Sequence, residues 1–295
     1  MKKRSLKFND KAKDFLKSMC FLSPSLLGVG VFFIIPFFVV VYYSVIDGVG
    51  SRNFVFLDNF VKLFHNSAFL TAAKNTLTFS FLAVPLAVIL SMALALMLEC
   101  RIPLKSQFRT FFLSPMMVPV ASVVLIWQVL FNYNGTVNEF IMLFGADKID
   151  WLKSDYCMVV IVVLFLWKNL GYNMILFMAA LSNIPRELLE VAEVEGASAA
   201  YQFFHIKLRY LSPTVLFVTI LSIINSFKVF REIYLLTGNY PYDGLYMMQH
   251  FMNNMFNSAD YQRLSAAAVL LAIVIVILIA LLFFVENIFG KDVEG

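Results

Sequence analysis

The stretch that decides the fold is PRELLEVAEVEGASAAYQFFHIKLRYLSP, residues 185–213, a charged segment between two strongly apolar ones. Pro185 suits the first turn of a helix, and the carboxylates that follow it favour the N-terminal part. Its alanines are strong helix formers, whereas Gly196 interrupts the pattern and Pro213 opens the next apolar segment. The stretch therefore predicts a short helix, a glycine break and a second short helix that together project from a membrane surface toward a soluble partner.

The composition is that of a membrane protein. Hydrophobic residues make up 61% of the 295 residues and charged residues only 14%, and the mean hydropathy is +0.80. Soluble globular domains have far less apolar compositions. At about 20 residues per transmembrane helix, this length accommodates about six spans with short loops and no large soluble domain. We therefore expect an all-α integral membrane fold, and the net charge of +4 indicates topology rather than nucleic-acid binding.

The apolar segments define the expected organisation. Pro115 and Pro119 are expected to kink the third span, and the last span is almost purely aliphatic, which suits contact with lipid or with a packed bundle. A basic N-terminal segment, residues 1–20, precedes a transmembrane domain, residues 21–290, and a short tail, residues 291–295. The six expected spans are residues 21–45, 76–98, 111–131, 157–181, 211–236 and 264–285.

The distribution of Lys and Arg predicts the orientation. With the N-terminus inside, 14 of the 23 Lys and Arg residues fall on the cytoplasmic side, 6 fall outside and 3 lie within spans. Cytoplasmic loops carry the excess of positive charge in membrane proteins. The sequence therefore predicts a multi-pass protein of the plasma (inner) membrane with both termini and residues 185–213 in the cytoplasm.

Residues 183–213 resemble the EAA loop of binding-protein-dependent ABC transporter permeases, in particular the sugar and glycerol-phosphate importer branch. Three positions depart from the pattern: Val191 replaces its first Ala, Glu195 replaces the usual Asp, and Arg209 replaces a frequent Pro. The residues that match are Glu190, Ala192, Gly196, Ala197, Phe203, Ile206, Leu208, Leu211 and Pro213.

This resemblance implies a type I ABC importer permease fold in which the loop is the coupling helix. In that family the loop sits in a cleft of a separate ATPase, which binds the ATP and Mg, so the permease itself needs no cofactor. The implied partners are a second permease, most simply as a heterodimer, an ABC ATPase dimer, an extracytoplasmic solute-binding protein and the bilayer. The residues expected to couple to the ATPase are Glu190, Ala192, Glu195, Gly196, Ala197 and Phe203. From spacing alone, a solvated amphipathic loop remains the alternative.

No pattern for catalysis or metal binding is apparent. The three cysteines and three histidines are scattered, without the spacing of metal ligands. The sequence has no G-x-S-x-G, no H-E-x-x-H and no P-loop, so we expect neither an enzyme nor a nucleotide-binding chain.

Polar residues inside the expected spans predict a substrate pathway, because such residues are costly in a bilayer and usually face a bundle interior or a water-filled path. Hydrogen bonds to sugar hydroxyls would come from these groups, with Trp167 or Phe227 against a pyranose ring. Alternatively, Lys228 and Glu232 form an i, i+4 pair that only fixes helix packing. The expected pathway residues are Lys168, Tyr172, Asn173, Ser222, Asn225 and Lys228.

The function expected from these observations is that of a permease subunit of an ATP-driven importer, which forms the translocation pathway for a carbohydrate or a related polyol or sugar phosphate. The alternative is an ion-coupled secondary transporter of a polar solute, which would use the intramembrane charges for coupling. Such a carrier is expected to show an internal repeat, and no convincing repeat is present here.

Overall fold

The computed structural model describes residues 3–48, 50, 52–99 and 103–289. The chain is about 80% helical, and the only pairing of extended backbone in these described ranges is an isolated antiparallel bridge between Ile46 and Phe54. Cys100, Arg101 and the predicted tail 291–295 lie outside the described residues. The chain divides into two compact units, Met1–His65 with Met255–Ala272 and Asn66–Asn254 with Ile273–Gly295. The all-α membrane fold expected from composition is confirmed.

The first unit begins with a helical run that crosses residue 20 without a break. A π-helical segment separates α1 from α2 directly before Pro36, whose missing N–H removes one hydrogen bond from the helix. At the end of α2, the buried Asn59 side chain donates hydrogen bonds to the carbonyls of Ser44 at 3.0 Å and Ile46 at 2.8 Å. This unit contains α1 (Lys3–Val29), η1 (Gly30–Ile34), α2 (Ile35–Ser44) and α3 (Asp58–Phe64), and the start of α14.

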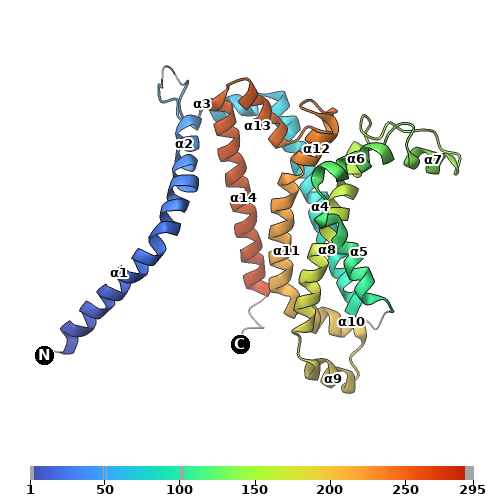
Figure 1. The fold of residues 1–295 in the computed structure, drawn as a ribbon, viewed down its shortest axis with the longest axis horizontal. Coiled ribbons are helices and arrows are strands. Elements are labelled where there is room, and N and C mark those ends of the chain that lie inside the picture. The colour runs from blue at the N-terminus through green and yellow to red at the C-terminus, as the bar shows by residue number, and fades with distance from the viewer. Residues whose placement is uncertain (1–2, 49, 51, 100–102, 290–295) are drawn as a thin grey trace. The chain divides into compact units, whose positions relative to one another are not determined.

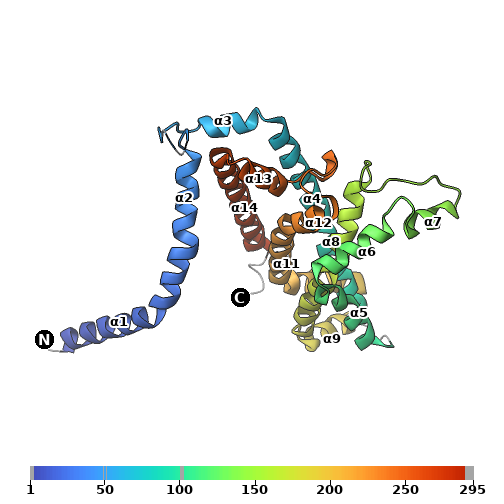
Figure 2. The same cartoon turned by 45° about the horizontal axis from the view of Figure 1, so that its top comes forward.

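The second unit is a helical bundle (Figures 1 and 2). In it α4 packs along α8, and α11 packs against both. Helix α14 (Tyr261–Phe289) contributes its second half to this unit. Its other helices are α4 (Ser67–Glu99), α5 (Lys105–Met117), α6 (Val120–Leu130), α7 (Thr136–Met142), α8 (Cys157–Ser182), α9 (Arg186–Val194), α10 (Ala199–Gln202), η2 (Phe203–Lys207), α11 (Leu208–Lys228), α12 (Phe230–Thr237), η3 (Asp243–Leu245) and α13 (Met248–Asn257).

Two apolar clusters fill this bundle. One joins α4, α6, α8 and α12 around Phe79, Phe165 and Ile233, and the other joins α4, α8 and α11 around Phe177 and Leu211. All five side chains are almost fully buried. Because both clusters share α4 and α8, these two helices are the centre of the unit, and the remaining helices are placed relative to them.

A glycine sets the spacing between α5 and α8. A Cβ atom at Gly171 on α8 would lie 1.9 Å from the backbone oxygen of Phe112 on α5. A larger residue at this position would force the two backbones apart, so the close approach of α5 and α8 requires glycine here.

Among the residues that the structure describes, five helices are long and apolar enough to cross a membrane, and a bent pair makes a sixth if it is one span. The predicted spans 76–98, 157–181 and 264–285 are confirmed within the longer helices α4, α8 and α14. The predicted third span, 111–131, falls on two helices, α5 and α6, which are bent by 100° at Val118 and Pro119, one of the two prolines expected to kink it. Val118 between them is extended, with φ −82° and ψ 130°, because a residue that precedes proline disfavours the helical region.

Candidate functional site

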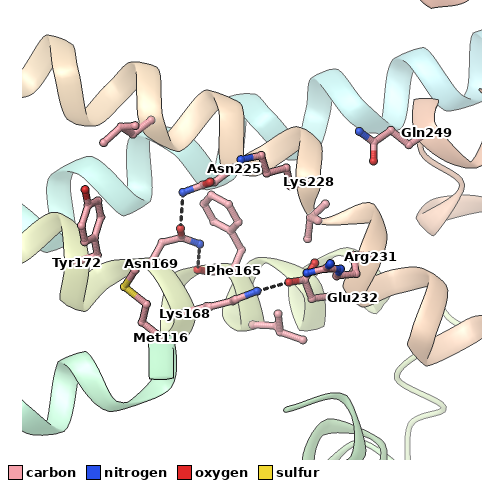
Figure 3. A pocket seen from close by; sticks show the side chains of 13 residues that line it. Met116, Phe165, Lys168, Asn169, Tyr172, Asn225, Lys228, Arg231, Glu232 and Gln249 are labelled. Atoms are coloured by element: carbon pink, nitrogen blue, oxygen red, sulfur yellow. Dashed lines mark hydrogen bonds and ion pairs between the residues drawn. The ribbon is translucent and has the colours of Figure 1, made fainter. Parts of the chain in front are cut away.

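A cavity of about 620 Å³ opens in the second unit between α5, α8, α11, α12 and α13 (Figure 3). Helix α8 contributes Lys168, Asn169 and Tyr172, whose spacing places them on one side of the helix. Helix α11 contributes Asn225 and Lys228 from its last turns. The complete lining is Met116, Leu164, Phe165, Lys168, Asn169, Tyr172, Leu221, Asn225, Lys228, Val229, Arg231, Glu232 and Gln249.

An ion pair closes one side of this cavity. The Lys168 ammonium contacts the Glu232 carboxylate across the gap between α8 and α12 (Figure 3). Glu232 is only 5% exposed, and a carboxylate at such a depth is costly unless it is paired. The pair therefore neutralises the one carboxylate in the cavity lining and fixes the start of α12 against α8.

Two amide contacts hold α8 to α11. The Asn225 side chain donates a 3.0 Å hydrogen bond to Asn169 Oδ1, and Asn169 Nδ2 donates to the Phe165 carbonyl at 2.8 Å. One helical turn further along α8, Asn173 Nδ2 donates to Ser222 Oγ at 3.0 Å. Polar residues of the predicted fourth and fifth spans therefore face one another across α8 and α11.

The predicted pathway residues fall into two groups. Lys168, Tyr172, Asn225 and Lys228 line the cavity. Asn173 and Ser222 are each 1% exposed, bond to each other and lie outside the lining.

The two aromatic side chains expected to stack against a sugar, Trp167 and Phe227, do not line this cavity. Trp167 packs on Trp127 with ring centroids 5.1 Å apart, and Phe227 lies outside the lining of this cavity. The aromatic side chains that do line it are Phe165 and Tyr172.

Sequence reasoning missed the role of Glu232, and its Arg231 neighbour and Gln249 were not expected in the site. Glu232 pairs with Lys168 rather than with Lys228 four residues earlier, because the helix ends at Lys228 and restarts at Phe230. The intramembrane carboxylate was itself a signal, since such a group needs a cation. Gln249 lies on α13, outside the candidate spans, so no sequence signal marked it.

The predicted coupling segment forms a loop beyond the ends of α8 and α11 (Figure 1). Helix α9 ends at Val194, and Gly196 follows with φ +83°, a left-handed conformation that favours glycine. The Ala197 N–H then bonds back to the Ala192 carbonyl at 2.8 Å. The Ser198 hydroxyl caps α10 by accepting from the Tyr201 N–H. The helix, glycine break and second helix predicted from sequence are therefore present.

One ion pair anchors this loop to the bundle. Lys207 Nζ lies 2.7 Å from Glu99 Oε2 at the end of α4. Leu189 of α9 packs against the cluster that joins α4, α8 and α11. The loop is thus attached to the bundle at both its first and its last part.

The remaining surface of α9 carries unpaired apolar side chains. Leu188, Val191 and Val194 recur every three residues and are exposed, Val194 by 89%. Glu190 and Glu195 are exposed beside them. Of the other residues expected to couple, Gly196 is exposed and Ala192, Ala197 and Phe203 are half-buried. Apolar groups rimmed by carboxylates form a surface suited to a protein partner.

No set of three or more His, Cys, Asp and Glu residues that could hold a metal ion occurs in the part of the chain that the structure describes.

Residues 87–295 match the profile of the family described as binding-protein-dependent transport system inner membrane component. The chain is 29% identical over 246 residues to the arabinooligosaccharides transport system permease protein AraP of Bacillus subtilis (strain 168), which covers 80% of this chain and 75% of that protein. It is 33% identical over 210 residues to the sn-glycerol-3-phosphate transport system permease protein UgpA of Shigella flexneri, which covers 70% and 71%.

The fold is also similar to that of solved proteins. A chain from the crystal structure of a bacterial ABC transporter involved in the import of the acidic polysaccharide alginate superposes with a TM-score of 0.81. The match covers 98% of this chain and 99% of that one at 22% sequence identity. At this identity the likeness establishes the fold.

Proposed function

Because the chain belongs to the family of binding-protein-dependent transport system inner membrane components, we propose that it is the permease subunit of an ATP-driven carbohydrate importer. The observation that carries the proposal is the pairing of a polar cavity inside a membrane bundle with a projecting loop that joins the same two helices, α8 and α11. The first provides a route for a polar solute, and the second provides a surface through which a separate ATPase can act.

The cavity chemistry supports a hydroxyl-rich solute. Its wall offers amide groups from Asn169, Asn225 and Gln249 and the hydroxyl of Tyr172, which can donate to and accept from sugar hydroxyls. The relatives bear names for arabinooligosaccharide and glycerol-3-phosphate transport. A carbohydrate, polyol or sugar phosphate fits both observations.

Residues 183–213 are the proposed coupling segment. The exposed stripe of Leu188, Val191 and Val194 would enter an apolar cleft of the ATPase, while Glu190 and Glu195 would pair with basic groups at its rim. The turn at Gly196 sets the angle between α9 and α10, so the loop would move as one body with the ATPase. ATP and Mg would be bound by that partner, and this chain would remain non-catalytic.

The proposed orientation places the α9 end of the bundle in the cytoplasm. Lys105, Arg109, Arg186 and Lys207 gather near this end, where they line a second cavity or pair with Glu99. The positive-inside rule assigns such an end, with both chain termini, to the cytoplasm. The opposite end would then receive solute from an extracytoplasmic binding protein. A solved relative of this fold was crystallised with its periplasmic protein bound to alginate pentasaccharide.

Affinity purification of the tagged chain, co-expressed with its second permease and ATPase, tests the proposal. We expect wild type to retain the ATPase, and Glu190→Ala and Gly196→Pro to lose it, because proline cannot adopt φ +83°. Glu193→Ala is the matched control, since Glu193 is an exposed carboxylate on the same helix outside the family pattern. An intact wild-type chain that retains no ATPase, or a loop in which all three variants behave as wild type, would contradict the proposal.

A further inference from the structure

The charged groups in the cavity wall are unequal in number. Three cations, Lys168, Lys228 and Arg231, line it, against the single carboxylate of Glu232. The remaining lining residues are neutral. The wall therefore carries an excess of two positive charges.

The one carboxylate in the cavity wall, that of Glu232, is already paired with a cation. Glu232 is almost fully buried and pairs with Lys168 (Figure 3). Within the described ranges, neither the Lys228 nor the Arg231 side chain forms an ion pair or a hydrogen bond. Both excess charges thus belong to side chains that have no partner of their own among the residues that the structure describes.

These two cations are close in sequence and come from either side of one break. Lys228 is the last residue of α11, and Arg231 lies in the first turn of α12. The helix dipole explains the position of Lys228 in part, because a cation is favourable at a helix C-terminus. It does not explain Arg231, because a cation near a helix N-terminus is unfavourable. A ligand that brings negative charge would compensate both.

We propose that the imported solute is an acidic carbohydrate, one that carries a carboxylate or phosphate, and that Lys228 and Arg231 bind its charge. This inference rests on the proposed function and specifies its substrate. The guanidinium of Arg231 can bind either anion with two parallel hydrogen bonds. The Gln249 amide, together with the donor and acceptor capacity that Asn169 and Asn225 do not use on each other and on the Phe165 carbonyl, can bind the hydroxyls.

ATP-dependent uptake by cells that express the complete importer, including its binding protein, tests the inference with matched radiolabelled pairs. The pairs are trigalacturonate against galactotriose, glucose 6-phosphate against glucose, and glycerol 3-phosphate against glycerol. The first pair probes a carboxylate and the others a phosphate. We expect import of an acidic member and no import of its neutral counterpart.

Substitutions of the cavity cations then test whether Lys228 and Arg231 bind the negative charge of the solute. Lys228→Gln and Arg231→Gln should each lower uptake efficiency about tenfold or more, as loss of a hydrogen bond to a charged group does. Lys228→Arg should retain uptake. Lys153→Gln removes an exposed cation outside the cavity and should have no effect. The affinity of the separate binding protein for the solute should be the same with every variant, because these substitutions lie in the permease.

The outcomes separate the two proposals. Import of neutral members alone, or import of an acidic member at wild-type efficiency by both neutralised variants, overturns the acidic substrate and leaves the importer intact. An assembled complex that hydrolyses ATP but imports none of the six solutes overturns the carbohydrate importer itself.

Discussion

Gly171→Ala should destabilise the chain and distort the cavity, although it adds one methyl group to a helix interior. The new Cβ would lie 1.9 Å from the Phe112 backbone oxygen. An ordinary contact at about 3.5 Å requires α5 to move away from α8 by roughly 1.5 Å. Both groups belong to backbones, so no side chain can rotate away to accommodate the methyl group.

The cost follows from two opposing effects. Overpacking of this kind destabilises by about 1–3 kcal/mol, and the rigidity of two backbones places this site near the upper value. Replacing a helical Gly by Ala recovers about 1 kcal/mol of helix propensity. The expected net loss is about 2 kcal/mol, which corresponds to a fall of about 4–8 °C in the midpoint of thermal unfolding.

Thermal unfolding of the detergent-solubilised chain measures this effect. Cys157 is buried in the α8 core, so in a background with the other cysteines replaced by serine, its labelling by a thiol-reactive dye reports unfolding. Gly28→Ala is the matched control, since a Cβ at this helical position meets nothing within 4 Å. Equal midpoints for Gly171→Ala and Gly28→Ala would refute the reasoning. Because Met116 of α5 lines the cavity one turn beyond Phe112, Gly171→Ala should also lower uptake.

Two further predictions concern buried ionisable groups. Lys168→Met should destabilise by about 3 kcal/mol, because it leaves the buried Glu232 carboxylate unpaired, whereas Lys168→Met combined with Glu232→Leu should recover most of that loss. A thermal double-mutant cycle of these two substitutions measures both effects, and equal losses in the Lys168→Met and double variants would contradict the pairing. Burial lowers the pKa of His250 to about 4, so the unfolded chain, with an ordinary pKa of about 6.5, binds the proton first as the pH falls. Stability should be constant above about pH 6.5 and decline by up to about 3 kcal/mol between pH 6.5 and 4. His250→Phe should decline less over the same range, and identical pH profiles of the unfolding midpoint would contradict this account.

The sequence was sufficient to predict the long helices and the break at Gly196, but not which prolines interrupt a transmembrane helix. Apolar length alone identified α4, α8 and α14, since an apolar helix of this size is the simplest structure for such a segment in lipid. Proline was an ambiguous signal. Pro85 and Pro213 lie inside continuous helices, whereas the chain bends by 100° at Pro119. The difference depends on whether neighbouring helices support the freed carbonyl groups, which is a property of the packed bundle.

The sequence indicated which residues of α8 share a helix face, but it could not show which side chains bond to one another. Lys168 and Tyr172 are spaced i, i+4, which places both on one side of α8, and both line the cavity. This spacing could not show that Asn173, one residue further on, turns into the contact with Ser222 and leaves the cavity. It could not assign Glu232 to Lys168 either, because that pair is separated by 64 residues and depends on the break after Lys228.

The positions of the cavity and the loop on α8 and α11 constrain how the transporter can move. Asn169 lies about 20 Å along α8 from its end at Ser182, and Asn225 lies about 26 Å along α11 from its start at Leu208, at 1.5 Å per residue. Hydrogen bonds at Asn169–Asn225 and Asn173–Ser222 tie the two helices together between these points. A displacement of the loop would therefore carry α8 and α11 as one body. The cavity would then open at its other walls, on the side of α5 and α12 or toward the proposed second permease. On the α12 side, such an opening would break the Lys168–Glu232 pair between α8 and α12.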